Sequence, residues 1–157
     1  MSVALPPFSR LVDAHWRDVA RLAHALAGPE DGPDVAQQAW AQALAAYPSL
    51  RSSRNLRSWL LTITARCATD VHRARARRPL LAEAPDRAAP CSPEPPDEQL
   101  WDGVRRLPQR QRTAVVLHYV VDLDHAAIAG ALGTTPAASR RLVSDALATL
   151  RTLGVQR

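Results

Sequence analysis

The sequence predicts an all-α protein of two small helical domains joined by a flexible, proline-rich acidic linker. Alanine is abundant and runs of β-branched residues are rare, which favours helix. The segment 79–99 holds 6 of the 13 prolines and 5 acidic residues against one arginine. Because proline lacks an amide donor, this segment should be extended and act as a tether. The alternative is a long loop inside one domain, although structureless loops of this length are uncommon in compact domains.

The charge of the chain is divided into three parts. All 20 basic residues are arginine, and the net charge is +5. Residues 1–78 carry +5, residues 79–99 carry −4 and residues 100–157 carry +4. Two basic blocks indicate an anionic partner, nucleic acid before a membrane surface, and arginine suits phosphate and guanine contacts. A GC-rich genome would also produce the arginine bias.

The sequence lacks the patterns that are typical of several other classes of protein. Cys67 and Cys91 stand far apart, without the spacing of a metal site or a disulfide scaffold. The first ten residues lack the pattern of a signal peptide, and no apolar run reaches the length of a membrane span. There is no phosphate-binding glycine loop and no paired-carboxylate site. We therefore expect a cytoplasmic protein that is not an enzyme, needs no cofactor and is not inserted in a membrane.

One group of residues has the composition of a metal site. It consists of His118, Asp122, Asp124 and His125. No four-ligand spacing emerges, so we expect no metal. Asp124 is better explained as a helix cap, and His118 and Asp122 as exposed residues at a helix end.

The N-terminal block should contain three helices, over residues 8–27, 34–47 and 55–78. The sequence "AGPEDGP" separates the first two, and Pro48 ends the second. The predicted apolar stripe of the second helix consists of Ala36, Ala39, Trp40, Ala43, Leu44 and Tyr47. In the third helix Cys67 falls on the apolar stripe, which predicts a small buried side chain and not a reactive thiol.

Two polar faces of these helices are candidate binding surfaces. One face of the second helix carries Asp34, Gln37, Gln38 and Gln42. The third helix carries Arg66, Asp70, Arg73 and Arg77 at spacings of four, three and four. This second face is either a solvated surface with cations near a helix C-terminus or a ridge that follows phosphates.

The C-terminal block should contain four helices, over about 97–107, 109–122, 124–133 and 135–150. Asp124 is the predicted N-cap of the third, and Gly133 ends it where a left-handed residue is required. Ala129 followed by Gly133 is typical of a helix-turn-helix, because the small side chain allows close approach and the glycine allows the sharp turn. The last helix would enter the major groove and present Arg140 and Arg141.

In three segments the chain resembles the sigma-70 family of RNA polymerase sigma factors, of the extracytoplasmic-function type. "PDVAQQAW" (33–40) is similar to the family's clamp-binding segment D-x-x-Q-E-x-F. "RNLRSWLLTITARCATDVHRARARR" (54–78) is similar to the helix that contacts the −10 promoter element. "LPQRQRTAVVLHYVVDLDHAAIAGALG" (107–133) is similar to the start of the −35-binding domain. The three segments stand in the family's order.

The resemblance implies a role for each block. Residues 1–78 would be a three-helix region 2 domain, 79–97 a linker in the channel that later carries RNA, and 98–157 a four-helix region 4 domain. Core RNA polymerase would bind Asp34, Gln37, Gln38 and Gln42. The −10 DNA would contact Arg54, Asn55, Arg66, Asp70, Arg73 and Arg77, with a flipped base held by the loop 48–55. The −35 DNA would contact Arg110, Arg112, Thr135, Arg140, Arg141 and Ser144. Promoter DNA and an anti-sigma factor are the further implied partners.

Three positions depart from the family pattern. Gln38 replaces a glutamate, Ser139 stands where helix-turn-helix units bury valine or isoleucine, and Asp145 stands where a base often lies. The last two predict weak or unusual −35 binding, helped by a partner or activator. The alternative function is a sigma-like DNA-binding regulator or adaptor that does not itself initiate transcription.

Overall fold

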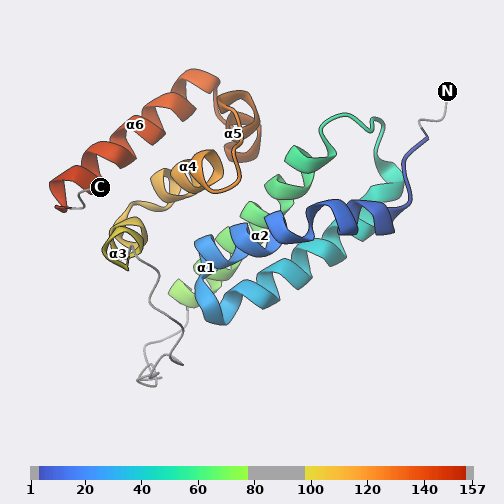
Figure 1. Ribbon diagram of the computed structural model, residues 1–157, viewed down its shortest axis with the longest axis horizontal. Coiled ribbons are helices and arrows are strands. Elements are labelled where there is room, and N and C mark those ends of the chain that lie inside the picture. The colour runs from blue at the N-terminus through green and yellow to red at the C-terminus, as the bar shows by residue number, and fades with distance from the viewer. Residues whose placement is uncertain (1–3, 78–97, 155–157) are drawn as a thin grey trace.

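The computed structural model describes residues 4–77 and 98–154, and their regular structure is helical throughout. Figure 1 shows two groups of helices lying side by side. The N-terminal block contains α1 (Phe8–Ala46), the short 3-10 helix η1 (Tyr47–Ser49) and α2 (Leu56–Arg77). The C-terminal block contains α3 (Glu98–Arg106), α4 (Gln109–Tyr119), α5 (His125–Leu132) and α6 (Pro136–Thr152). The predicted all-α class is confirmed. The predicted linker, residues 79–97, lies outside the described residues.

Helix α1 is two helical segments that meet at Gly28. This residue has φ 85° and ψ 175°, a conformation that glycine adopts without a side-chain clash. The predicted separator "AGPEDGP" was therefore too long, because the second segment already begins at Pro29, where a missing amide donor costs nothing. Farther along, a Cβ on Gly32 would lie 3.1 Å from the Cα of His24. The two segments thus approach each other closely only because residue 32 lacks a side chain.

Helix α2 packs along both segments of α1 and supplies much of the N-terminal core. Its buried residues are Leu60, Leu61, Thr64, Ala65, Cys67 and Ala68. The Thr64 hydroxyl donates to the Leu60 carbonyl at 2.9 Å, so this buried polar group is satisfied within the helix. Cys67 is buried as predicted, and burial, with a smaller effect of the Asp70 carboxylate, raises the pKa of its thiol.

Helix caps order the C-terminal block, and the two caps of α5 were predicted from the sequence. The Asp124 carboxylate accepts from the Ala127 amide at 2.8 Å, and Gly133 ends α5 with φ 64°. The Thr135 hydroxyl accepts from the Ala138 amide at 3.1 Å at the start of α6. Helix α4 ends at Tyr119, earlier than the predicted residue 122, because the chain turns through Asp122 with φ 54°.

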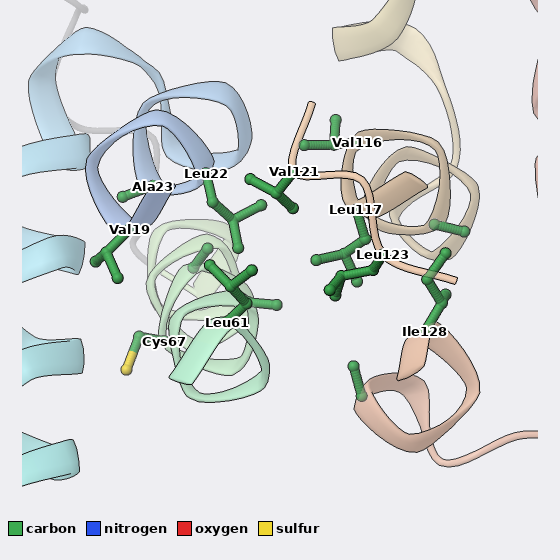
Figure 2. Packing of buried hydrophobic residues seen from close by; sticks show 14 of the residues in the cluster. Val19, Leu22, Ala23, Leu61, Cys67, Val116, Leu117, Val121, Leu123 and Ile128 are labelled. Atoms are coloured by element: carbon green, nitrogen blue, oxygen red, sulfur yellow. The ribbon is translucent and has the colours of Figure 1, made fainter. Parts of the chain in front are cut away.

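One hydrophobic cluster runs through both blocks. Leu22 of α1 and Leu61 of α2 point toward Val121, which follows α4, and all three side chains are almost fully buried (Figure 2). Leu117, Leu123 and Ile128 continue the cluster into the C-terminal block. The two predicted helical units are thus in direct contact through apolar side chains.

Candidate nucleic-acid interface

The second half of α1 presents the polar face proposed for protein contact. Asp34, Gln37, Gln38 and Gln42 are all exposed, while the opposite face buries Val35, Ala39 and Ala43. The predicted apolar stripe was wrong at Leu44, whose side chain is 56% exposed. At 100° per residue, Leu44 falls beside Gln37 on the polar face. Leu44 thus places one exposed apolar side chain on the face proposed for protein contact.

The basic face of α2 is on the surface of the N-terminal block. Arg66, Asp70, Arg73 and Arg77 are exposed along a helix, in the predicted spacing. Arg75 is held differently, because its Nε lies 2.8 Å from Asp31 Oδ2 on α1. Glu30 also lies within 3.7 Å of this guanidinium. Three exposed arginines on one face of α2 form the basic ridge, which we define as Arg66, Arg73 and Arg77.

A pocket of about 390 Å³ opens at the loop before α2. The loop contributes Arg54 and Asn55, both proposed DNA contacts, and α2 contributes Trp59. Asn55 has φ 59°, so the chain turns sharply there before the helix begins. Ala127 and Gly130 of α5, which no sequence pattern pointed to, also line this pocket. We call it the loop pocket.

Helix α6 carries the residues proposed to read DNA in the major groove. Arg140, Arg141 and Ser144 are exposed on it, and Thr135 forms its N-cap. Arg141 Nε lies 3.8 Å from Asp145 Oδ2, with side chains 85% and 54% exposed. Such an exposed pair is weak, so Arg141 can exchange Asp145 for a phosphate or a base at little cost.

We expect Asp145→Asn to strengthen DNA binding by α6, because it removes a negative charge beside Arg141. The gain should be roughly fivefold, in line with the energy of an exposed ion pair. Fluorescence anisotropy of the full chain on promoter DNA measures it. Asp102→Asn is the matched control, since Asp102 forms a similarly exposed pair with Arg105 on α3. An equal gain in both variants would mean that only net charge matters.

Two arginines proposed to contact the DNA backbone have partners inside the protein. Arg110 donates to the Leu132 carbonyl at 3.4 Å while remaining exposed. Arg112 donates to the carbonyls of Arg105 at 2.7 Å and Leu107 at 3.1 Å, which fixes the turn between α3 and α4. Burial lowers the pKa of Arg112. These contacts favour a structural role for Arg112, and its contact with DNA stays a prediction.

Ser139 is fully buried in the helix-turn-helix and has a specific partner. Its hydroxyl lies 3.0 Å from His125 Nδ1. The His125 ring stacks on His118 at 4.8 Å between centroids, and His118 Nδ1 lies 3.1 Å from the Leu123 carbonyl. His118 is therefore half-buried, contrary to the expectation that it is exposed. A polar contact replaces the apolar one that valine or isoleucine would make.

Among the described residues, no group of acids, histidines and cysteines could hold a metal ion.

We expect the C-terminal block to lose stability as the pH falls below about 6.5, the ordinary pKa of histidine. Desolvation, the stacked His118 and Arg140 lower the pKa of His125, against a smaller opposite effect of Asp124. Since the unfolded chain then binds the proton more tightly, acid favours unfolding, whereas nothing changes above that pH. Urea unfolding of the full chain between pH 5 and 8 measures this, and His125→Gln should flatten the pH dependence. An unchanged dependence in His125→Gln would assign it to another group.

The fold and these surfaces define an all-helical, helix-turn-helix protein of the nucleic-acid-binding class. Two family profiles identify it further: Sigma-70 region 2 matches residues 11–78, and Sigma-70, region 4 matches residues 97–150. The chain belongs to the sigma-70 family of RNA polymerase sigma factors and has the region 2 and region 4 arrangement of its extracytoplasmic-function type.

A curated relative and two solved structures agree with this assignment. The probable RNA polymerase sigma factor RfaY of Xanthomonas campestris pv. campestris is 31% identical over 163 aligned residues. The alignment covers 96% of this chain, and the chain spans 41% of the relative's length. The sigma factor RpoE, solved with the anti-sigma factor NepR from Bartonella quintana, has a TM-score of 0.77 at 22% identity, covering 96% of this chain and 98% of its own. CnrH, solved with the cytosolic domain of CnrY, has a TM-score of 0.70 at 22% identity, covering 93% and 86%. At these identities the two structures show a shared fold.

Proposed function

We propose that this protein binds core RNA polymerase and directs promoter-specific initiation by recognising −10 and −35 elements. The observation that carries the proposal is the match of region 2 to the N-terminal block and of region 4 to the C-terminal block. The polar face of α1, the basic ridge and the helix-turn-helix lie on the surface in the same chain order. A division into residues 1–78, a linker at 79–97 and residues 98–157 fits these roles.

The N-terminal block would open and hold the −10 element. The basic ridge would lie along the phosphates, since each neutralised phosphate releases condensed counterions. An unpaired base would enter the loop pocket beside Trp59, Arg54 and Asn55, which line it. Taking a base out of the stack costs a few kcal/mol, and contacts in a pocket offset this cost. Asp34, Gln37, Gln38 and Gln42 would face the polymerase at the same time.

The C-terminal block would bind the −35 element through α6. Arg140, Arg141 and Ser144 would face base edges and phosphates, and Thr135 and Arg110 would lie near the DNA backbone. The pairing of Arg141 with Asp145 fits a weak −35 contact that gains strength from a partner or activator. The acidic segment 79–97, which lies outside the described residues, would occupy the positively charged RNA channel.

An anti-sigma factor is a further proposed partner. Both similar structures contain a second protein: RpoE is bound to the anti-sigma factor NepR, and CnrH is bound to the cytosolic domain of CnrY. None of the described helices is long and apolar enough to cross a membrane. We propose that the protein works in the cytoplasm, where polymerase and promoter DNA are found.

Transcription in vitro with purified core polymerase tests the proposal. We expect a transcript with a defined start site that disappears when either promoter element is changed. The alternative, a sigma-like regulator that does not initiate transcription, predicts a DNA complex that forms without polymerase and yields no new transcript. The matches to sigma factor regions give that alternative no specific support.

A further inference from the structure

Tyr47 fixes the N-terminal segment of the chain to the element that leads into the loop pocket. Its hydroxyl, on η1, donates to the main-chain carbonyl of Pro6, forty-one residues earlier. The Tyr47 residue is only 8% exposed, so little water competes for this hydrogen bond. Figure 1 shows the N-terminal segment passing the end of α1, where η1 begins. Residues far apart in the sequence are thus joined at the start of the loop.

An aromatic row extends from the same segment to the pocket. The Phe8 ring packs edge-on against Tyr47, with 5.3 Å between ring centroids, and against Trp40 at 6.0 Å. The Tyr47 ring lies 6.3 Å from the ring of Trp59, which lines the loop pocket. Aromatic pairs have preferred geometries and add stability beyond the area that they bury. The position of Trp59 therefore depends on Tyr47, and that of Tyr47 on Phe8.

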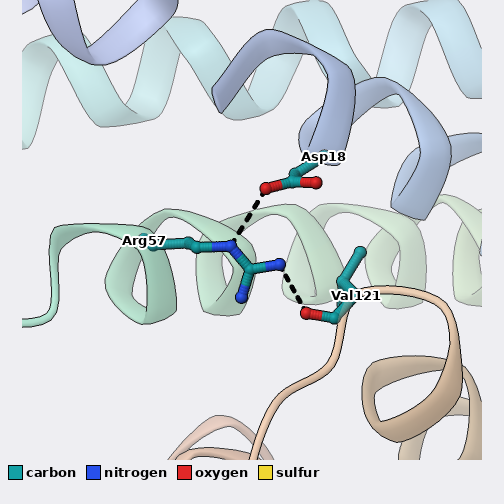
Figure 3. Close-up of polar contacts among 3 residues, drawn as sticks. All are labelled: Asp18, Arg57 and Val121. Atoms are coloured by element: carbon teal, nitrogen blue, oxygen red, sulfur yellow. Dashed lines mark hydrogen bonds and ion pairs between the residues drawn. The ribbon is translucent and has the colours of Figure 1, made fainter. Parts of the chain in front are cut away.

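Arg57 holds the first turn of α2 from another direction. Its Nε donates to Asp18 Oδ2 on α1 at 3.0 Å, and its Nη2 donates to the main-chain carbonyl of Val121 after α4 (Figure 3). The second contact makes Arg57 a bridge between the blocks, whereas the first lies within the N-terminal block. Leu56 and Ser58, the neighbours of Arg57 in the sequence, line the loop pocket. The α2 side of the pocket is thus fixed to α1.

The loop between η1 and α2 is held mainly through its ends. Residues 51–55 are all exposed, so the core does not cover them. The Leu50 amide donates to the Tyr47 carbonyl at 3.1 Å, and the Arg54 amide donates to the Ser52 hydroxyl at 3.1 Å. Because the α2 end is fixed to α1, the position of the loop relative to Trp59 depends on Tyr47 at the other end.

We propose that Tyr47, held by Phe8 and by the Pro6 carbonyl, positions the loop pocket to receive an unpaired nucleobase. This inference rests on the proposed function, in which that base belongs to the −10 element. Neither Tyr47 nor Phe8 lines the pocket, so both are positioning residues that act through Trp59 and the loop. A pocket whose walls are already in place binds more tightly, because fewer groups must be ordered when the ligand arrives.

The first test measures the loop in the free full chain, without DNA. We expect Tyr47→Phe to speed hydrogen exchange at the amides of Leu50 and Arg54 by about fivefold, the effect of one lost hydrogen bond. Phe8→Ala should act in the same direction. Tyr119→Phe is the matched control, since it removes the same hydroxyl from a residue that is 55% exposed. Unchanged exchange in both Tyr47→Phe and Phe8→Ala would overturn the positioning role.

The second test uses the full chain bound to core polymerase and a single-stranded DNA selected for binding to that complex. With the native protein, each base of the strand is replaced in turn by an abasic site, and the captured base is the one whose loss weakens binding most. In Tyr47→Phe the advantage of this base over the abasic site should fall by about fivefold. Affinity for the abasic strand itself should stay the same. A loss of folded protein would weaken both strands equally, so the ratio distinguishes positioning from stability.

The possible outcomes separate this inference from the proposed function. If the native complex captures a base and the ratio is unchanged in Tyr47→Phe and in Phe8→Ala, the positioning role is overturned. If no abasic site weakens binding of the native complex, base capture is overturned, whatever the exchange at Leu50 shows. If the ratio falls as expected but the complex makes no transcript from a defined start site, the proposed function fails while the positioning role stands.

Discussion

Replacing Arg66, Arg73 and Arg77 together with glutamine should remove most −10-dependent transcription while the protein stays folded. The three side chains are exposed on one helix, so their loss leaves the core unchanged. If each contacts one phosphate of a single strand, the slope of log affinity against log salt should fall by about 2. Transcript yield should fall by at least about tenfold at physiological salt. Promoter binding by the variant holoenzyme, titrated with salt, measures the slope, and transcription in vitro measures the yield.

The control for this variant keeps the same net charge. Arg10, Arg17 and Arg21 are exposed on the first segment of α1 and are not among the proposed −10 contacts. Their joint replacement by glutamine removes the same three charges. We expect this control to retain most of its transcription and its salt slope. Equal losses in the two triple variants would show that overall charge, and not the ridge, determines binding.

Leu60→Ala should destabilise the N-terminal block by about 2–5 kcal/mol, the cost of a cavity at a fully buried leucine. A three-helix unit of this size has little stability in reserve, so a large part of the chain should be unfolded at 37 °C. Urea unfolding followed by circular dichroism measures the free energy of unfolding.

Leu44→Ala is the matched control because it makes the same change at an exposed position of α1. We expect its stability to change by less than about 0.5 kcal/mol, as for surface substitutions in general. Its binding to core polymerase should weaken if the polar face is the clamp-binding surface. A stability loss in Leu44→Ala as large as that in Leu60→Ala would contradict the exposure of Leu44.

Local features of this fold could be predicted because their causes lie within a few residues. The Asp124 cap, the left-handed Gly133 and the start of α6 at Pro136 each depend on neighbouring backbone groups. The hinge of α1 was harder, since its position depends on how closely the segments can approach. Gly32 allows the second segment to approach His24 of the first, and no pattern of neighbouring residues predicts how close the two segments lie.

Features that depend on distant residues could not be predicted. Leu44 fits the apolar spacing of its helix, but α2 does not cover that side, so it is exposed. The contact of Ser139 with His125 joins positions fourteen residues apart across the turn. A polar residue at a position that is usually apolar was the available signal, and a search for its hydrogen-bond partner would have pointed to His125.

The candidate site was predictable as faces of helices but not as an assembled surface. The exposed sides of α1, α2 and α6 follow from helical periodicity alone. The α5 wall of the loop pocket and the Arg57 bridge follow from how the blocks meet, which depends on residues 64 positions apart. Whether the named side chains bind polymerase and DNA stays a prediction.

The position of Trp59 makes its intrinsic fluorescence a direct probe of the loop pocket. Trp59 lines the loop pocket, so a nucleobase that stacked on its indole ring would quench its emission without any attached dye. The other tryptophans, at positions 16, 40 and 101, do not line that pocket and can be replaced by phenylalanine to leave one signal. A single-tryptophan protein would then report entry of a base in real time and separate that step from the arrival of polymerase.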